Sequence, residues 1–363
     1  MPRTDALEIT DIPVPEYERV ARAIHRESGL HAIIAIHDRT LGPALGGMRM
    51  WNYRSEDEAL TDVLRLSKGM TYKSALARTG LGGGKSVVIG DARTDKSEAL
   101  FLAMGRFIES LGGAYITAED VGTTIPDLEI VRRETKWVTG LSVASHSSGN
   151  PSPYTAIGCL VGLRAVLEAG FRTSSPRGLT FAIQGVGAVG SALARGLAKE
   201  GAKLVVADMH EDRAKAVAAE IGARHVPHET ILEQECDVLA PCALGGVVND
   251  RTIARFACKA IAGCANNQLL EPRHGDVLAE RGILYAPDYV INAGGIINVS
   301  CELHDGGYRE AEARRRIDAI YPTLKEIFEI AAREGTSTHR AADRLAERIL
   351  AEGKKRQSNG KAR

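Results

Sequence analysis

Short runs of apolar, β-prone residues alternate with stretches of helical periodicity along most of the chain. The clearest runs span residues 31–37, 85–89, 179–184 and 203–208. Strands and helices that follow one another in this way are typical of layered α/β folds. We therefore expect an α/β architecture.

Helical periodicity is strongest in the second half of the chain. A helix is predicted for residues 155–169, the apolar positions between Ile317 and Phe328 fall on one helical face, and a last helix should run from about Thr338 to Ala351. Residues 353–363 are polar and basic and lack apolar periodicity, so we expect a disordered tail there.

The chain has 363 residues, more than one hydrophobic core usually organises. Residues 142–153 are rich in Ser, Gly, Asn and Pro, which is typical of a connection between domains. We therefore predict four parts. They are a first domain at 1–147, a second at 148–335, a C-terminal helix at 336–352 that returns toward the first domain, and the tail at 353–363.

The composition of the chain indicates which kinds of molecule it can bind. Lysine plus arginine equals aspartate plus glutamate at 46 each, so the chain has no overall field that would attract nucleic acid or an anionic membrane. The N-terminus lacks an apolar signal core, and no apolar run approaches the roughly 18 residues of a membrane span. We expect small-molecule ligands, no nucleic acid, no membrane, and a cytoplasmic location.

Cysteine and histidine usage does not indicate a metal centre. The six cysteines contain no CxxC pair and lie in apolar surroundings, as expected of reduced core residues. His225 and His228 lie three positions apart, but no further cluster of ligand type accompanies them. We therefore predict no metal.

Two lysines twelve positions apart are candidates for chemistry. Lys85 follows Gly82, Gly83 and Gly84, and glycines allow a backbone to approach a ligand closely. Nearby ammonium groups on Lys73 and Lys85 would disfavour each other's protonation, so one of them could act as a base near pH 7. Lys85 is our candidate base. The alternative is that both are ordinary surface lysines.

A glycine-rich motif follows the apolar run at 179–184. It reads Gly185-Val186-Gly187-Ala188-Val189-Gly190 and leads into a helix-prone stretch. This GxGxxG pattern allows a tight turn, close approach of a pyrophosphate and close helix packing. The next predicted strand ends at Asp208, where a carboxylate can accept a hydrogen bond from a ribose 2′-hydroxyl, which favours NAD over NADP. Arg213 lies nearby and leaves NADP open. The alternative is a glycine-rich turn and a helix cap.

With both features in hand, the chain resembles the Glu/Leu/Phe/Val amino-acid dehydrogenase family, and looks closest to its leucine-type members. The shared segments span residues 40–47, 69–73, 81–85, 115–124, 148–153 and 286–295. The resemblance implies two domains, an N-terminal α/β domain for substrate binding, catalysis and oligomerisation and a Rossmann-type NAD-binding domain. It also implies reversible oxidative deamination of an L-amino acid to a 2-oxo acid and ammonium. A homo-oligomer is expected, with an octamer as the first guess.

The resemblance further implies roles for individual residues. Lys73 would hold the substrate carboxylate, with help from the backbone at Gly46 and Gly47. Lys85 would act on the attacking water, and Asp120 would exchange protons with the amino group. These residue types suit that chemistry, although Asp120 taken alone is more often a turn or cap residue.

Other matched positions concern the cofactor. The family pattern implies that Thr155 binds the nicotinamide carboxamide and that Ala240, Asn266 and Asn267 line the cofactor cleft at the ends of successive strands. Asn267 is also expected at the substrate. The alternative for the two asparagines is a solvent-facing turn.

Substrate preference is inferred from four matched positions. Glutamate-specific relatives have a lysine where this chain has Leu45 and a hydroxyl where it has Val299, so a distal carboxylate would be desolvated without a partner. Ala118, Ile296 and Val299 match positions that line the side-chain pocket of leucine-type enzymes. We expect turnover of leucine, valine and isoleucine. The alternatives are a phenylalanine dehydrogenase and a non-catalytic, regulatory NAD-binding protein.

Overall fold

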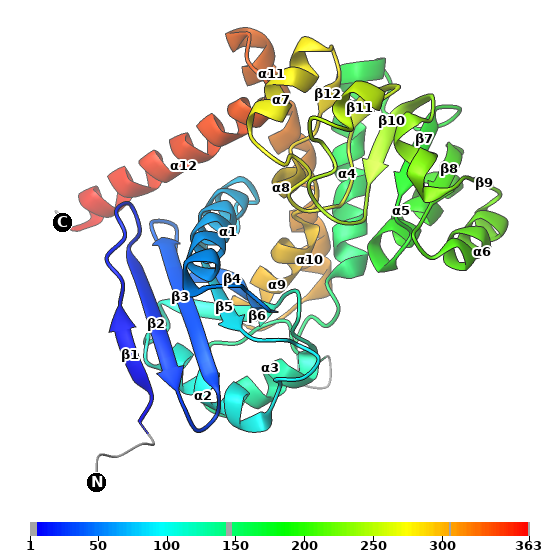
Figure 1. The fold of residues 1–363 in the computed structure, drawn as a ribbon. Coiled ribbons are helices and arrows are strands. Elements are labelled where there is room, and N and C mark those ends of the chain that lie inside the picture. Colours follow the sequence, from blue (N-terminus) through cyan, green and yellow to red (C-terminus); the bar gives the residue numbers. More distant parts are fainter. Residues whose placement is uncertain (1–5, 143–146, 305, 362–363) are drawn as a thin grey trace. The chain divides into compact units, whose positions relative to one another are not determined.

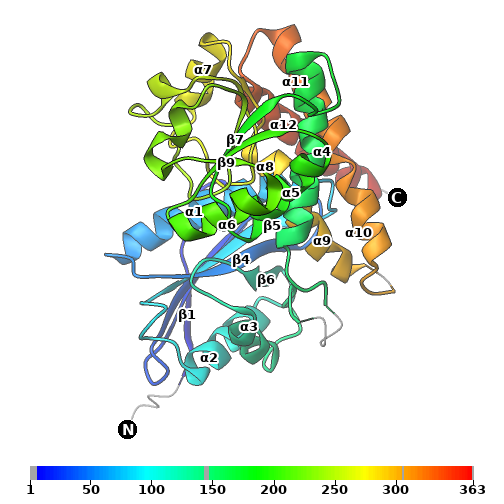
Figure 2. The same ribbon diagram turned by 90° about the vertical axis from the view of Figure 1, so that its right-hand side faces the viewer.

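The computed structural model describes residues 6–142, 147–304 and 306–361 (Figures 1 and 2). The chain divides into two compact units, each with its own sheet. Unit 1 comprises Met1–Asn150, Val299–Tyr308 and Glu347–Arg363, and unit 2 comprises Pro151–Asn298 and Arg309–Ala346. The sequence analysis placed this division after residue 147. Residues 143–146 of the predicted connection lie outside the described residues.

Unit 1 is built on a six-stranded mixed sheet with the order β1-β2-β3-β5-β4-β6. Its strands are β1 (Glu8–Asp11), β2 (Arg19–His25), β3 (Leu30–Asp38), β4 (Ala44–Trp51), β5 (Gly82–Ile89) and β6 (Tyr115–Glu119). The pairs β1–β2, β2–β3 and β3–β5 are antiparallel, whereas β4 runs parallel to both β5 and β6. The central strands therefore place the carboxyl ends of β4, β5 and β6 at one edge of the sheet.

Helices cover both faces of this sheet. Helix α1 (Glu56–Leu76) packs on one face, where Ile33 of β3 and Val63 of α1 belong to the same buried cluster. Helices α2 (Glu98–Glu109) and α3 (Ile125–Arg132) cover the other face, which buries Ile34. Because neighbouring residues of a strand point to opposite faces, burial on both faces explains why β3 is apolar almost without interruption.

Unit 2 contains a six-stranded sheet in which every pair is parallel, with the order β12-β11-β10-β7-β8-β9. Its strands are β7 (Thr180–Gln184), β8 (Lys203–Ala207), β9 (Arg224–His225), β10 (Cys236–Pro241), β11 (Cys258–Ile261) and β12 (Leu284–Tyr285). The order reverses beside β7, as in doubly wound Rossmann-type sheets. The predicted two-domain α/β fold is thus confirmed.

The helices of unit 2 lie before, between and after these strands along the chain. They are α4 (Ser152–Phe171), α5 (Ala188–Lys199), α6 (Glu211–Ile221), α7 (Arg273–Glu280), α8 (Asp288–Ile291), α9 (Gly294–Ser300), α10 (Glu310–Ile317) and α11 (Ile320–Glu334). Short 3₁₀ helices occur in this unit at His228–Glu233 and Ile253–Arg255, and a third, Cys301–Leu303, lies in a segment that belongs to unit 1. The apolar face predicted between Ile317 and Phe328 is divided between α10 and α11, which are separated by two residues.

Helix α4 is the one helix among the described residues that is long and apolar enough, by length and composition, to cross a membrane. It packs inside unit 2 against α5 and α11. A Cβ at Gly158 would lie 2.8 Å from Ile320 Cδ1, and one at Gly162 would lie 2.9 Å from Leu324 Cδ1. These close approaches identify α4 as a core helix.

The expectation of a disordered tail is wrong for residues 353–361. Helix α12 (Thr338–Lys361) continues through them, and its part from Glu347 onward belongs to unit 1. Lys354 Nζ lies 3.3 Å from Asp38 Oδ2, and Gln357 Nε2 donates to the Thr40 carbonyl at 2.9 Å. The added part of the helix makes polar contacts with the end of β3 and with Thr40, which apolar periodicity could not reveal. Residues 362 and 363 lie outside the described part.

Candidate active site

A buried ion pair joins the two residues that the sequence analysis assigned to proton transfer. Lys85 lies on β5 and is 5% exposed, and Asp120 directly follows β6. Lys85 Nζ lies 2.8 Å from Asp120 Oδ2. Opposite charges in direct contact, with little access to water, form a pair across which a proton can move. The charged group in contact with Lys85 is thus a carboxylate, whereas the sequence-based prediction invoked the ammonium group of Lys73.

The turn after β6 fixes Asp120 in place. Thr123 Oγ1 donates to the Met48 carbonyl on β4 at 2.7 Å, and the Thr123 amide donates to the Asp120 carbonyl at 3.0 Å. Gly122 has φ +83°, and a Cβ there would lie 1.9 Å from the Met50 carbonyl oxygen. The turn is therefore held tightly against β4, in a conformation that favours glycine.

A second cation contacts the same carboxylate. Arg49 Nε lies 3.0 Å from Asp120 Oδ2, and Arg49 Nη1 lies 2.9 Å from Asp62 Oδ2. Burial alone would raise the pKa of the Asp120 carboxyl, but the charges of Lys85 and Arg49 outweigh it and hold that pKa below its usual value. Asp120 is therefore ionised at neutral pH.

Gly47 packs closely against this ion pair. A Cβ at Gly47 would lie 2.7 Å from Asp120 Cβ and 3.3 Å from Lys85 Nζ. Ala118 of β6 is the residue paired with Gly47 across the sheet. The structure thus brings Gly47, Lys85, Ala118 and Asp120 together at one place in unit 1.

The other glycines near the site have a different role from the one expected. The sequence analysis assigned Gly82, Gly83 and Gly84 to close approach of a ligand. A Cβ at these positions would instead lie 2.3 Å from the Asp38 carbonyl oxygen, 2.0 Å from the Thr71 amide nitrogen and 2.8 Å from the Tyr115 ring, respectively. Neighbouring protein atoms fill this space, so the glycines allow close packing of the sheet and α1.

The remaining predicted substrate residues lie on several elements. Lys73 is in the last turn of α1, Gly46 and Leu45 are buried on β4, and Ile296 and Val299 are buried on α9. A Cβ at Gly46 would lie 1.8 Å from the Gly84 carbonyl oxygen, which shows that this glycine is needed for packing of β4 on β5. Leu45 is 2% exposed and presents no charge.

The GxGxxG motif forms the turn between β7 and α5. Gly185 has φ +91°, and a Cβ at Gly190 would lie 2.0 Å from the Gly185 carbonyl oxygen, so both positions require glycine. A Cβ at Gly187 would meet nothing within 4 Å. Helix α5 begins at Ala188 without a capping side chain. Open space at a helix N-terminus fits the pyrophosphate of a dinucleotide.

Asp208 lies directly after β8, as the motif predicted. Its Oδ2 accepts from the Val186 amide at 2.8 Å, and its Oδ1 accepts from the His210 amide at 2.9 Å and from Arg213 Nη2 at 2.6 Å. Burial would raise the pKa of Asp208, but the bond to Arg213 and the two amide bonds lower it overall. The carboxylate is therefore ionised and held beside the glycine-rich turn.

The other predicted cofactor residues follow the same edge of the sheet. Ala240 lies near the end of β10, and Asn266 and Asn267 are exposed in the loop after the neighbouring β11. Asn292 Nδ2 donates to Asn266 Oδ1 at 2.8 Å. Thr155 lies in the first turn of α4, where its hydroxyl donates to the Pro151 carbonyl at 3.1 Å. Ligands of open α/β sheets bind at this edge.

The sequence analysis did not find Arg49, Asp62 and Tyr53. Tyr53 Oη donates to Asp62 Oδ2 at 2.7 Å, so the three side chains extend the charge network from Asp120. One signal was available for Arg49. It lies two positions after Gly47 on β4, and residues two apart on a strand point to the same face.

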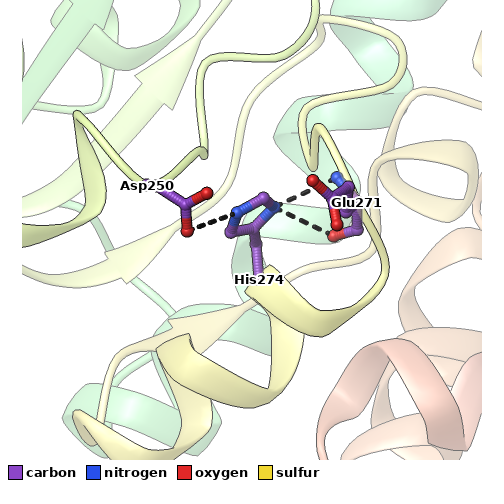
Figure 3. Close-up of side chains that lie close together, drawn as sticks. All are labelled: Asp250, Glu271 and His274. Atoms are coloured by element: carbon purple, nitrogen blue, oxygen red, sulfur yellow. Dashed lines mark hydrogen bonds and ion pairs between the residues drawn. The ribbon is translucent and has the colours of Figure 1, made fainter.

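A cluster in unit 2 has the ligand types of a metal site (Figure 3). Asp250, Glu271 and His274 place their ligand atoms within 4.8 Å of one another. Arg273 Nη2 lies 2.6 Å from Asp250 Oδ2, and Arg273 Nε lies 2.9 Å from Glu271 Oε2. The bond to Arg273 lowers the pKa of Asp250 to about 2. Since the guanidinium already neutralises both carboxylates, the cluster is an ion-pair network rather than a prepared metal centre.

Comparison with known proteins agrees with this geometry. Residues 17–137 match the family model described as Glu/Leu/Phe/Val dehydrogenase, dimerisation domain, and residues 206–357 match that of Glutamate/Leucine/Phenylalanine/Valine dehydrogenase. A leucine dehydrogenase of Thermoactinomyces intermedius is 54% identical over 332 residues, which cover 92% of this chain and 90% of the relative. A phenylalanine dehydrogenase of Caldalkalibacillus thermarum is 46% identical over 349 residues, which cover 94% and 93%.

A solved structure extends this similarity to the fold. L-tryptophan dehydrogenase from Nostoc punctiforme has a TM-score of 0.82 at 42% identity, over 93% of this chain and 97% of that one. The predicted resemblance is thus confirmed by sequence and by structure. The chain belongs to the Glu/Leu/Phe/Val dehydrogenase family of amino-acid dehydrogenases.

Proposed function

We propose that this protein catalyses the reversible, NAD-dependent oxidative deamination of L-leucine, and also of L-valine and L-isoleucine. The products are the 2-oxo acid, ammonium, NADH and a proton, with one water consumed. The observation that supports this most directly is the contact of the buried Lys85 with Asp120, against which Gly47 packs. The relatives at 53–55% identity over about nine-tenths of the chain are leucine dehydrogenases.

In the proposed mechanism, residues of unit 1 hold the substrate and move its protons. Lys73 binds the carboxylate, assisted by the backbone of Gly46 and Gly47. Asp120 takes a proton from the substrate ammonium, which makes the nitrogen lone pair available as the Cα–H bond breaks. Lys85, once it has released its ammonium proton to solvent and is neutral, takes a proton from the water that attacks the iminium carbon. Asp120 returns its proton to the amine, the C–N bond breaks as the hydroxyl of the intermediate loses its proton to form the 2-oxo acid, and the departing ammonia takes up that proton as ammonium.

We propose that unit 2 binds the cofactor. Bound NAD supplies the acceptor for the hydride that leaves the substrate Cα. The turn from Gly185 to Gly190 and the N-terminus of α5 would hold the pyrophosphate, and Asp208 would accept from the adenosine ribose. We assign the carboxamide to Thr155 and the walls of the site to Ala240, Asn266 and Asn267.

The preference for branched-chain substrates follows from apolar residues and the lack of a charge. Leu45, Ala118, Ile296 and Val299 would surround an aliphatic side chain, and none offers a partner to a distal carboxylate. A single methylene changes discrimination by only about 1–3 kcal/mol, so leucine, valine and isoleucine should all react. The alternative is a preference for aromatic amino acids, because a phenylalanine dehydrogenase and a tryptophan dehydrogenase are among the relatives.

Initial rates of NADH formation test this proposal. L-leucine, L-valine, L-isoleucine, L-phenylalanine, L-tryptophan and L-glutamate should be compared at saturating NAD, with NADP in parallel. Fast turnover of the branched-chain set is the expected result. A preference for phenylalanine or tryptophan would keep the reaction and overturn the pocket assignment. If NAD binds but no substrate reacts, the protein is a non-catalytic NAD-binding protein.

Replacing Asp208 with serine is expected to weaken NAD binding and to shift the ratio of kcat/KM toward NADP by about tenfold or more. Losing a bond to a charged acceptor costs roughly 1.5–3 kcal/mol. The change also frees Arg213, now paired to Asp208, for a 2′-phosphate. Asp212→Ser is the matched control, because Asp212 is a nearby exposed carboxylate on α6. An unchanged cofactor ratio in Asp208→Ser would remove Asp208 from the site.

We also propose a cytoplasmic homo-oligomer. The first family model matched by the chain describes a dimerisation domain, and it covers most of the described part of unit 1. Light scattering on the purified protein is expected to give about eight times the chain mass of 38.9 kDa, as for an octamer. A mass of two or four chains would reject the octamer while leaving the dimerisation domain in use.

A further inference from the structure

Arg49 occupies the middle of a buried series of charges in unit 1. Its Nε lies 3.0 Å from Asp120 Oδ2, and its Nη1 lies 2.9 Å from Asp62 Oδ2. The three side chains are only 17–22% exposed. A guanidinium is planar and rigid, so one bound at two edges has a fixed orientation. Arg49 is therefore held as firmly as the carboxylate that it contacts.

The far end of this series is also fixed. Asp62 lies on α1 and accepts from Tyr53 Oη at 2.7 Å and from Arg65 Nη2 at 3.1 Å. Burial and the neighbouring Asp62 raise the pKa of Tyr53, so its hydroxyl stays protonated and remains a donor. Burial would raise the pKa of Asp62 itself, but the bond from Tyr53 and the charge of Arg49 lower it. Asp62 thus anchors Arg49 as a carboxylate.

Both cations at Asp120 use the same oxygen. Lys85 Nζ contacts Oδ2 at 2.8 Å and Arg49 Nε contacts it at 3.0 Å. These contacts, together with the hydrogen bond that the carboxylate accepts from the Val121 backbone, fix its rotation.

We propose that Arg49 is a positioning residue for this reaction, one that holds Asp120 Oδ2 beside Lys85 Nζ and so orients the carboxylate for the substrate amino group. The inference rests on the proposed function, because it assigns Arg49 a task only if Asp120 and Lys85 transfer protons. Arg49 acts through Asp120 and does not itself bind the substrate.

A pocket next to Arg49 makes the proposal testable with a small molecule. The pocket has a volume of about 660 Å³ and is lined by Arg49, Arg65, Asp62 and Tyr53 among others. Trp51 and Val121, which also line it, are 54% and 51% exposed. Since the pocket opens to solvent, a guanidinium ion can reach the space left by the Arg49 side chain when that side chain is removed.

The test is the variant Arg49→Ala, assayed with and without millimolar methylguanidinium. Without the additive, kcat should fall roughly 10- to 100-fold, the loss typical of a misplaced reacting group. Methylguanidinium should restore a measurable part of it, whereas sodium chloride at equal ionic strength should not. A merely structural role for Arg49 predicts no recovery, because a free ion cannot repair a displaced strand.

The pH profile gives an independent readout. Removing Arg49 leaves Lys85 as the one cation paired with Asp120, so the pKa of Asp120 should rise. The acid limb of kcat/KM is then expected to move to higher pH, because Asp120 must be ionised to accept a proton. The other titratable groups around Asp120 are Glu119 and Tyr115 on β6 and, beyond Arg49, Asp62 on α1. These groups are present in both proteins.

Arg65→Ala is the matched control. Arg65 lines the same pocket and contacts the same Asp62, but it is 60% exposed and does not reach Asp120. Its kcat, its pH profile and its response to methylguanidinium should equal those of the unaltered protein. Arg49→Lys is the second variant, useful if Arg49→Ala does not fold. Lysine keeps the positive charge but cannot contact Asp62 and Asp120 at the same time, as the guanidinium does. Both the fall in kcat and the shift of the acid limb should therefore be smaller than in Arg49→Ala.

The outcomes separate this inference from the proposed function. Normal kcat and an unchanged acid limb in a folded Arg49→Ala protein would overturn the inference and leave the proposed function in place. Loss of activity without recovery and without a shifted acid limb would also overturn it. If the unaltered protein deaminates no amino acid, the proposed function itself fails.

Discussion

Replacement of Lys85 by alanine is expected to lower kcat by roughly 10²- to 10⁴-fold, the contribution usual for a positioned acid or base. The reason is the location of Nζ, which is buried and lies 2.8 Å from Asp120 Oδ2. Solvent water cannot replace it there at low cost, because Gly47 and Asp120 leave little room. NAD binding should change little, since the proposed cofactor residues lie in unit 2.

Two measurements check this expectation together. Steady-state NADH absorbance with L-leucine gives kcat and KM, and a fluorescence titration gives the affinity for the dinucleotide. Lys136→Ala is the control, because Lys136 is an exposed lysine of the same unit that stacks on Trp137. Near-normal turnover in Lys85→Ala would show that Lys85 is not the acid or base. Loss of NAD binding together with turnover would indicate general damage to the fold.

The structure explains why sequence motifs found Lys85 and Asp120 but not their contact. Each residue lies in a recognisable segment, yet 35 positions separate them. Their contact depends on β4 pairing with both β5 and β6, which is a long-range property of the sheet. Arg49 was missed for a related reason. Its importance comes from Asp62 and Asp120, which approach it from α1 and from the turn after β6.

The two units differ in how far their folds could be predicted. In unit 2 the run from β7 through α5 to β8 is local, and one motif with its Asp208 indicates the Rossmann-type arrangement. In unit 1 the strand order β1-β2-β3-β5-β4-β6 places β5 between β3 and β4. Local patterns carry no such information. The end of α12 was missed because its contacts to Asp38 and Thr40 are polar.

The glycines before Lys85 illustrate the limit of a motif argument. A glycine permits close approach of anything, and the sequence does not say whether the neighbour is a ligand or the protein itself. In the structure the neighbour of Gly83 is α1, since a Cβ would lie 2.0 Å from the Thr71 amide nitrogen and 2.4 Å from Thr71 Cα. Residues 82–85 thus contain both the candidate base and the glycines whose close packing holds it in place.

Gly83→Ala is therefore expected to destabilise unit 1 by about 3 kcal/mol or more, at the upper end of overpacking costs. The clash is with backbone atoms of α1, which cannot rotate away as a side chain can. Gly69→Ala is the matched control. Gly69 lies inside α1, is exposed, and has nothing within 4 Å of its Cβ position. Replacing a glycine within a helix by alanine should stabilise the protein by about 0.5–1 kcal/mol.

Urea unfolding followed by tryptophan fluorescence compares the two variants directly. Both tryptophans of the chain, Trp51 and Trp137, lie in unit 1, so the signal reports the unit in which the substitutions are made. The midpoint should move to lower urea for Gly83→Ala and to slightly higher urea for Gly69→Ala. Equal midpoints would mean that α1 does not approach β5 as closely as the structure has it. Lys85, which lies on β5 two residues after Gly83, would then need another source of its fixed position.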